Sequence, residues 1–223
     1  MLSSIAFIPD GNRRYALKNG VNFAKAYSVG FEKTRQVFEW CLEVPKLNEL
    51  TMWTISTENL SRTGVELSVF TRLLNRKLVE AKNDPLITDN DVKVSVIGRL
   101  EMLPYYVQEA AVELMRATAE NTGRALNLAI GYGGRQELVD AIQSVVAAGL
   151  PVTEENISNS LYTSTEPDLI VRTGDTQRLS GFMPWQSAYS ELYFSKKLWP
   201  DFEKPDFDDA ISSYSLRDRR FGK

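Results

Sequence analysis

An acidic residue, an amide and two arginines follow directly after the first apolar run of this chain. Residues 5–8 are apolar and Pro9 ends the run. A short apolar run closed by turn residues predicts a buried strand. In open α/β sheets, ligands bind just beyond the carboxyl ends of the strands. The sequence therefore predicts that Asp10, Asn12, Arg13 and Arg14 lie where a ligand would bind.

Three later predicted strands also run into polar or glycine-rich loops. These loops span residues 56–59, 131–135 and 172–175. In a parallel sheet, the carboxyl ends of the strands lie at one edge, so the four loops are expected to meet there. The glycine-rich loop taken alone would more often be a turn that starts a helix. Together, the four loops predict one shared site.

Arginines are concentrated in or beside these loops. A guanidinium matches phosphate oxygens in a bidentate way, which a lysine ammonium does not do. In an otherwise acidic chain, this clustering indicates a specific polyanion, most simply a diphosphate. The alternative is a set of surface ion pairs worth about 0–1 kcal/mol each. The residues concerned are Arg13, Arg14, Arg62, Arg172 and Arg178, with Ser180 close by.

The chain has no histidine and a single cysteine, Cys41, among its 223 residues. This composition excludes catalysis by an imidazole base, Ser-His-Asp and Cys-His nucleophiles, and zinc sites built on histidines or several cysteines. Catalysis must then use carboxylates, amides, hydroxyls, arginines or a metal held by oxygen. Oxygen ligands favour Mg²⁺, which commonly acts with phosphates.

The remaining composition predicts a cytoplasmic protein. The formal net charge is −3, so general affinity for nucleic acid is not expected. The sequence lacks an apolar run long enough for a transmembrane helix and the pattern of a signal peptide. An amphiphilic product would bring at most peripheral contact with a membrane.

Strand and helix patterns alternate along the whole chain. Strands are expected at 5–9, 50–55, 92–97, 125–130, 168–171 and 192–194, and helices at 24–42, 65–81, 103–121, 136–148, 154–161 and 206–219. This alternation predicts an α/β fold with a mainly parallel central sheet of about six strands, covered by helices on both faces. No linker or repeat interrupts it, so residues 1–223 are expected to form a single domain.

These motifs resemble the signatures of the cis-prenyltransferases, the undecaprenyl diphosphate synthase family. The similarity begins with residues 10–16 (DGNRRYA), 56–59 (STEN) with Arg62, and 131–135 (GYGGR). It continues through 168–174 (DLIVRTG), 178–180 (RLS), 191–194 (ELYF), 198–202 (LWPDF) and 220–222 (RFG). The resemblance spans nearly the whole chain. It implies a hydrophobic tunnel, a homodimer and a Mg²⁺ cofactor.

The reaction implied by the resemblance is condensation of isopentenyl diphosphate with an allylic prenyl diphosphate, which makes a Z-polyprenyl diphosphate. By the same resemblance, Asp10 holds Mg²⁺ and assists departure of diphosphate, and Glu191 is a second metal ligand. Asn59 lies near the proton that is lost. The allylic diphosphate is held by Gly11, Asn12, Arg13 and Arg14, and isopentenyl diphosphate is held by Arg172, Arg178 and Ser180. Further substrate-binding residues are Tyr15, Ser56, Thr57, Glu58 and Arg62, while Arg220 and Gly222 reach the neighbouring subunit's site.

The chain departs from the family's usual pattern at several of these places. The family usually has arginine at Phe23 and histidine at Tyr27, both near the allylic diphosphate, and glycine at Arg13. Tryptophan is usual at Leu60 and histidine at Gln177. We hypothesise that Arg13 supplies charge lost at Phe23. The departures leave open a different primer or a non-diphosphate acceptor.

Two other classes of function are weighed against this one. A non-catalytic partner subunit of a cis-prenyltransferase would tend to lose the site residues, which this chain retains. A nucleotide-binding α/β protein would need GxxxxGK[ST] or GxGxxG, and neither is present. For the enzyme, a short or medium product is expected, with Met52 or Trp53 limiting the tunnel, although both residues are equally well explained as ordinary core.

Overall fold

The fold is built on one parallel sheet of six strands. The computed structural model describes residues 1–61 and 64–217. Within these ranges the strand order is β3-β4-β2-β1-β5-β6, and every neighbouring pair is parallel. The strands are β1 (Ser4–Ile8), β2 (Glu49–Ser56), β3 (Lys93–Ile97), β4 (Ala125–Tyr132), β5 (Leu169–Arg172) and β6 (Glu191–Phe194).

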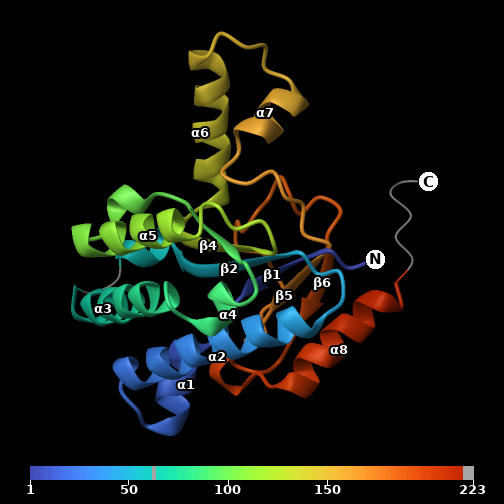
Figure 1. The fold of residues 1–223 in the computed structure, drawn as a ribbon. Coiled ribbons are helices and arrows are strands. Elements are labelled where there is room, and N and C mark those ends of the chain that lie inside the picture. The colour runs from blue at the N-terminus through green and yellow to red at the C-terminus, as the bar shows by residue number, and fades with distance from the viewer. Residues whose placement is uncertain (62–63, 218–223) are drawn as a thin grey trace.

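Helices connect the strands and cover the sheet (Figure 1). Figure 1 shows α6 and α7 standing away from the rest of the molecule. None of the helices in the described ranges combines the length and apolar character needed to cross a membrane. The helices are α1 (Asn12–Asn19), α2 (Phe23–Glu43), α3 (Gly64–Ala81), α4 (Pro85–Thr88), α5 (Tyr105–Ala117), α6 (Gly134–Ala147), α7 (Glu154–Ser160) and α8 (Lys204–Ser215).

The two faces of the sheet are buried by different means. Because side chains alternate along a strand, β1 sends Ile5 and Phe7 into the larger core and Ala6 and Ile8 into a smaller one. The larger core contains apolar residues of α2, α3, α5 and α8. The smaller core includes Phe182 from the segment that follows β5. The predicted sheet with helical covering is confirmed, and its two covering layers are unequal.

Local sequence signals account for several element ends. Asn22 caps α2 by accepting a hydrogen bond from the Lys25 amide at 2.9 Å. Thr153 caps α7, accepting from the Asn156 amide at 3.2 Å. Side-chain oxygens at these positions satisfy amides that have no partner inside the helix.

Several of the sequence-based element boundaries need correction. The short helices α1 and α4 were not expected, because eight and four residues carry too little periodicity to be recognised. Strand β4 continues to Tyr132, so two residues of the predicted glycine loop belong to the strand. Helix α5 ends at Ala117, before the predicted residue 121. The last described helix ends at Ser215, before the predicted residue 219.

Strand β2 also departs from the strict alternation that its sequence predicts. Its pairing with β4 shifts register between Trp53 and Ile55, and again between Ile55 and Ser56. Met52 and Ile55 consequently share the larger core, whereas Trp53 stacks on Phe182 on the opposite face, with ring centroids 4.9 Å apart. A register shift of this kind changes which face the following side chains occupy.

Candidate functional site

The carboxylate of Asp10 lies between two arginines just beyond the end of β1. Its Oδ1 is 3.0 Å from Nη2 of Arg14, which is four residues further along the chain, in α1. Its Oδ2 accepts a hydrogen bond of 2.9 Å from Nη2 of Arg172, the last residue of the adjacent strand β5. The two neighbouring strands therefore bring together two positive charges and one negative charge, as the loop sequences predict.

Arg172 is fixed in place although it carries a charge. Its side chain is 7% exposed. Its Nη1 donates to Oγ of Ser180 at 2.7 Å and to the carbonyl of Arg178 at 2.5 Å. Its buried Nε finds no hydrogen-bond partner among the described residues. A buried donor without a partner is costly, so this N–H indicates a place where a ligand acceptor fits.

Gly11 turns the chain from β1 into α1. Its φ is 118°, and an added Cβ would lie 2.9 Å from Cδ2 of Leu198, so both the conformation and the space require glycine. The first turn of α1 has no acidic side chain and its first residue receives no side-chain cap. The first amides of a helix lack partners within it and attract anions. They begin two residues after Asp10, beside the arginine pair.

Asn12 is held between α1 and α2. Its Nδ2 lies 3.5 Å from the carbonyl of Pro9, and its buried Oδ1 has no partner among the described residues. A Cβ added at Gly30 would lie 2.2 Å from that Oδ1. Glycine at this point of α2 therefore leaves room for the Asn12 side chain.

These groups line a polar pocket of about 470 Å³ at the carboxyl edge of the sheet. The pocket borders an apolar cavity of about 380 Å³ between the sheet and helices α2 and α3. Five residues line both spaces: Pro9, Asn12, Tyr27, Thr54 and Phe70. Such a pair of adjoining spaces fits an amphiphile with an anionic head and a hydrocarbon tail.

Most of the predicted site residues face the polar pocket. Asn59 lies on its wall, and the Asn59 amide donates to Oγ of Ser56 at 3.2 Å. The lining residues that the sequence predicted are Asp10, Gly11, Asn12, Arg13, Arg14, Ser56, Glu58, Asn59, Arg172 and Ser180. The segments that follow β1, β2 and β5 therefore bring most of their predicted polar residues to the wall of one pocket.

A second polar pocket lies beside the first. It is lined by Thr57, residues 133–136 and Gly181, and it shares Glu58 and Ser180 with the first pocket. Burial alone would raise the pKa of Glu58. Hydrogen bonds from its own amide and from Ser56 and Thr57 lower that pKa by more than burial raises it, so the net shift is downward. Glu58 is consequently held as an anion between the two pockets.

Arg13 lies close to the residues that depart from the family pattern. Its guanidinium carbon is 5.9 Å from the centroid of the Phe23 ring. Its Nε is 3.5 Å from Oε1 of the buried Glu66, which also accepts a 2.5 Å hydrogen bond from the Tyr27 hydroxyl. Arg13 thus places positive charge over Phe23, which is compatible with the hypothesis about its role.

Several predicted residues are not brought into the pocket. Tyr15 and Arg178 do not line it; Arg178 instead contributes its carbonyl to Arg172. Glu191 begins β6 in register with Leu169 and Ile5, at the opposite edge of the sheet from Asp10, and its Oε2 is paired with Arg217 at 2.6 Å. The predicted residues Arg62, Arg220 and Gly222 lie outside the described residues.

Some residues of the two spaces were not singled out from the sequence. Thr54, Phe70 and Glu66 lie in or beside them, but each is part of an ordinary strand or helix pattern. The helical spacing of Tyr27 with Phe31, and of Phe70 with Leu74, is the one sequence signal that could have placed these side chains on the wall of one cavity.

The acidic groups fit a metal that takes part of its coordination from a ligand. Within residues 1–61 and 64–217, no three carboxylate or cysteine side chains are close enough to hold a metal by themselves. Mg²⁺ is usually held by one or two carboxylates together with substrate phosphates. Asp10, partly exposed in a pocket suited to phosphates, meets that requirement.

Comparison with known proteins places these features in a family context. Residues 8–222 match the family described as putative undecaprenyl diphosphate synthase. The chain is 43% identical to a geranylgeranyl-diphosphate-specific tritrans,polycis-undecaprenyl-diphosphate synthase of Pyrobaculum aerophilum, over 98% of this chain and 95% of that one. It is 41% identical to an isoprenyl transferase of Thermus thermophilus, over 98% and 88%.

Two solved structures have the same fold. Lavandulyl diphosphate synthase from Lavandula x intermedia, in complex with dimethylallyl diphosphate, superposes with a TM-score of 0.92 at 32% identity over 98% of this chain and 97% of that one. A probable undecaprenyl diphosphate synthase from Campylobacter jejuni gives 0.86 at 33% identity, over 100% and 99%.

Proposed function

This chain belongs to the undecaprenyl diphosphate synthase family and is a cis-prenyltransferase, and we propose that it condenses isopentenyl diphosphate with an allylic prenyl diphosphate. The product is a Z-polyprenyl diphosphate of short or medium length. We also propose that the whole chain, residues 1–223, works as one catalytic domain. The single observation that carries the proposal is the arginine-lined pocket that opens into an apolar cavity.

The allylic diphosphate is proposed to lie across these two spaces. Its head contacts Arg14, Asn12 and the first amides of α1, and its hydrocarbon tail enters the apolar cavity past Tyr27 and Phe70. When the allylic carbon–oxygen bond breaks, negative charge accumulates on the departing diphosphate. Fixed donors aimed at that charge stabilise the transition state more than the ground state, which is the condition for raising the rate.

Isopentenyl diphosphate is proposed to occupy the part of the site near Arg172 and Ser180. Its alkene forms the new carbon–carbon bond as diphosphate leaves, and it then loses a proton to form the new double bond. Asn59 is too weak a base to take this proton, so we assign it the role of orienting the reacting groups. A diphosphate oxygen or a carboxylate accepts the proton.

Mg²⁺ is the proposed cofactor, with Asp10 as its carboxylate ligand. When bound, it would neutralise charge on the diphosphate. Arg14 and Arg172 now pair with Asp10 at 3.0 and 2.9 Å. Arg14, whose side chain is about half exposed, can turn to phosphate oxygens when substrate is present, which releases one oxygen of the Asp10 carboxylate. The buried Nε–H of Arg172 can donate to a phosphate oxygen while the side chain stays in place.

A homodimer is proposed from the surface of α6. Val139, Ile142 and Val146 are 48%, 39% and 61% exposed, and their helical spacing places them on neighbouring parts of one face. Exposed apolar patches of this kind mark contact sites. Since Glu191 and Asp10 lie at opposite edges of the sheet, Glu191 can act as a metal ligand only in a site to which a second subunit contributes. A cytoplasmic location is also proposed.

A variant reaction is the second candidate. It is favoured by the high TM-score, 0.92, to a lavandulyl diphosphate synthase in complex with dimethylallyl diphosphate, and by the unusual residues at Phe23 and Tyr27. In this case the primer would be a short allylic diphosphate, or the acceptor would differ from isopentenyl diphosphate. A non-catalytic partner role is disfavoured because Asp10, Asn12, Arg14 and Arg172 are all present and face the pocket.

One assay separates these candidates. Purified protein is incubated with Mg²⁺, radiolabelled isopentenyl diphosphate and each of several allylic diphosphates of increasing length, and the products are separated by chromatography. Elongated products with Z double bonds support the main proposal. Product formed from allylic diphosphate without incorporated label supports the variant reaction. No product with any primer contradicts the main proposal and is the result expected of a non-catalytic partner subunit.

A further inference from the structure

The apolar cavity has charged residues in its deeper part. Its near end is marked by Tyr27 and Thr54, which also line the polar pocket. Arg35 lies about 12 Å further along α2, at a rise of about 1.5 Å per residue. On the opposite wall, Leu50 lies about 13 Å back along β2 from Thr54, at about 3.3 Å per residue. The two walls therefore extend to a similar depth, at the level where the charges appear.

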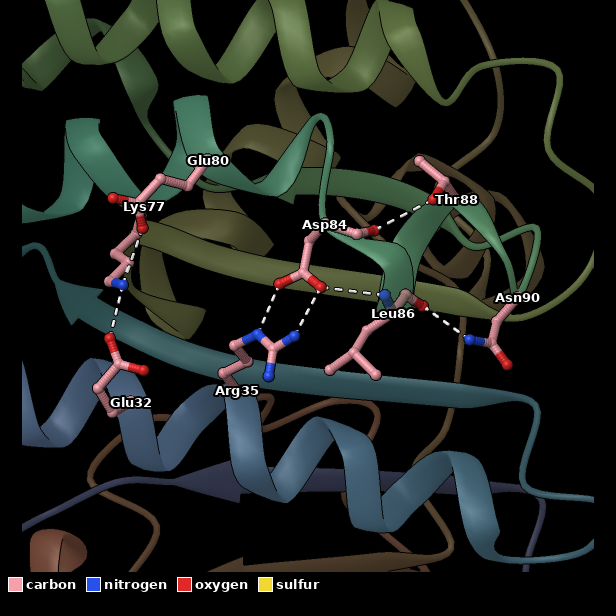
Figure 2. A network of polar contacts seen from close by, with 8 residues as sticks. All are labelled: Glu32, Arg35, Lys77, Glu80, Asp84, Leu86, Thr88 and Asn90. Atoms are coloured by element: carbon pink, nitrogen blue, oxygen red, sulfur yellow. Dashed lines mark hydrogen bonds and ion pairs between the residues drawn. The ribbon is translucent and has the colours of Figure 1, made fainter.

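Ion pairs cross the gap between α2 and the α3–α4 segment at this depth (Figure 2). Arg35 donates through Nε and Nη2 to the two oxygens of Asp84, at 2.7 and 2.9 Å. Lys77 Nζ of α3 donates to Oε1 of Glu32 in α2 at 2.6 Å and to Oε2 of Glu80 at 2.8 Å. We call these five residues, Glu32, Arg35, Lys77, Glu80 and Asp84, the polar gate.

The polar gate faces the cavity and the solvent at the same time. All five residues line the cavity, yet the side chains of Arg35, Glu32 and Glu80 are 45%, 54% and 51% exposed. The gate is therefore a thin layer of charge between the hydrocarbon-lined space and the outside. Phe38 and Ile87 line the cavity beside it.

The charges in the gate are held in their ionised forms by one another. The hydrogen bond to Asp84 raises the pKa of Arg35. Burial alone would raise the pKa of Asp84, but hydrogen bonds from Arg35 and from the Leu86 amide lower it overall. Burial likewise opposes ionisation of Lys77, and its bonds to Glu32 and Glu80 reverse this, so its pKa is raised. Hydrocarbon that displaced these bonds would leave unpaired charges against an apolar chain, which is unfavourable.

We propose that the polar gate closes the deep part of the prenyl cavity and limits the length of chain that it accepts. This inference rests on the proposed function, because it assigns the cavity to a prenyl tail. A short tail packs against the apolar walls and leaves the ion pairs intact. A longer tail must separate the ion pairs in order to pass between α2 and α3. The polar gate is thus a determinant of chain-length specificity, on a different wall from Met52.

A purely structural role is the competing explanation, since the same bonds join α2 to the α3–α4 segment. Half-exposed ion pairs contribute little to folding stability, and the chain offers a matched pair for comparison. Lys82 Nζ lies 2.7 Å from Oε2 of Glu113 in α5, with similar exposure, and neither residue lines the cavity. Lys82→Met removes an ion pair of the same kind without touching the gate.

The test uses Arg35→Met and the double variant Arg35→Met/Lys77→Met, with Lys82→Met as the control. Methionine keeps an unbranched apolar stem and removes the positive charge, and the half-exposed carboxylates of Glu32 and Glu80 can then turn to solvent. Asp84 is left in place because its Oδ1 caps α4, accepting from the Leu86 amide at 3.0 Å. Dissociation constants are measured for unreactive linear alkyl phosphates of increasing length, by calorimetry, so that the result does not depend on turnover. Product length with isopentenyl diphosphate is measured in parallel.

In the wild-type protein and in Lys82→Met, affinity should rise with chain length and then level off at the same length. In the double variant it should continue to rise beyond that length, by about fourfold for each further methylene that becomes buried, and products should lengthen by at least one prenyl unit. The inference is overturned if affinity in the folded double variant levels off at the same chain length as in the wild-type protein, or if Lys82→Met changes that length as much as the double variant does. Wild-type protein that binds the alkyl phosphates but forms no product contradicts the proposed function alone.

Discussion

Replacing Gly30 with alanine places a methyl group against the Asn12 side chain. The added Cβ would lie 2.2 Å from Oδ1 and 3.1 Å from Cγ of Asn12, while the next neighbour, Cδ1 of Trp199, is 3.4 Å away. The obstacle is thus the end of a flexible side chain and not the backbone. We expect Asn12 to swing away from the polar pocket while α2 stays in place.

The expected magnitude follows from two opposing effects. Alanine in a helix interior is more favourable than glycine by about 1 kcal/mol, so the free energy of unfolding should change little or increase. Asn12 would lose its bond to the diphosphate, and a hydrogen bond to a charged group is worth about 1.5–3 kcal/mol. The dissociation constant for an allylic diphosphate should therefore rise about 10- to 150-fold.

The assay measures binding of an unreactive allylic thiodiphosphate by calorimetry, together with thermal unfolding. Gly64→Ala is the matched control, because a Cβ at Gly64 in α3 meets nothing within 4 Å. Asn12→Ala should weaken binding similarly, and adding Gly30→Ala to it should cost nothing more, since both changes remove one interaction. Unchanged affinity in a stable Gly30→Ala protein would refute the role given to Asn12.

Three further outcomes are expected. Asp10→Asn should lower kcat at least about 100-fold, as loss of one strong electrostatic contact does. The Mg²⁺ concentration needed for half-maximal activity should also rise, and an unchanged Mg²⁺ dependence would contradict the role of Asp10 as a metal ligand. Val146→Glu on α6 should convert a dimer to monomers in sedimentation analysis, whereas a wild-type protein that is already monomeric would contradict the proposed interface. The hydrogen bond from Arg99 lowers the pKa of Asp140 to about 2, from an ordinary value of 3.8. This bond therefore stabilises the fold above about pH 4, and the stabilisation is lost as the pH falls towards 2. In Asp140→Asn, the free energy of unfolding measured with urea should fall less between about pH 4 and pH 2 than it does in the wild-type protein. An equal fall in both proteins would show that the pair contributes nothing.

Much of the site could be predicted because the responsible signals are local. An apolar run followed by polar residues identifies where β1, β2 and β5 end, and parallel strands place those ends at one edge. The residue types then restrict the chemistry, since a chain without histidine and with arginines in these loops suits a diphosphate. Asp10, Asn12, Arg14 and Arg172 were found in this way.

Other parts of the site depend on contacts between residues far apart in the chain. Asp10 and Arg172 are 162 residues apart and Arg35 and Asp84 are 49 apart, and no local pattern specifies which of many charges will pair. The position of Ile55 on the same face as Met52 has a similar origin. The register shift in β2 arises from its pairing with β4, and the side-chain alternation within β2 does not reveal it.

The sequence alone determined, to within one residue, where β1, β2 and β5 end. It also determined the residues that follow these strands and the absence of imidazole chemistry, because these depend on residue type and on neighbours along the chain. Only the tertiary structure decided that the polar pocket opens into an apolar cavity, that Gly30 makes room for Asn12, and that Glu191 lies at the other edge of the sheet from Asp10. These features come from how helices and strands pack, and packing satisfies all long-range contacts at once.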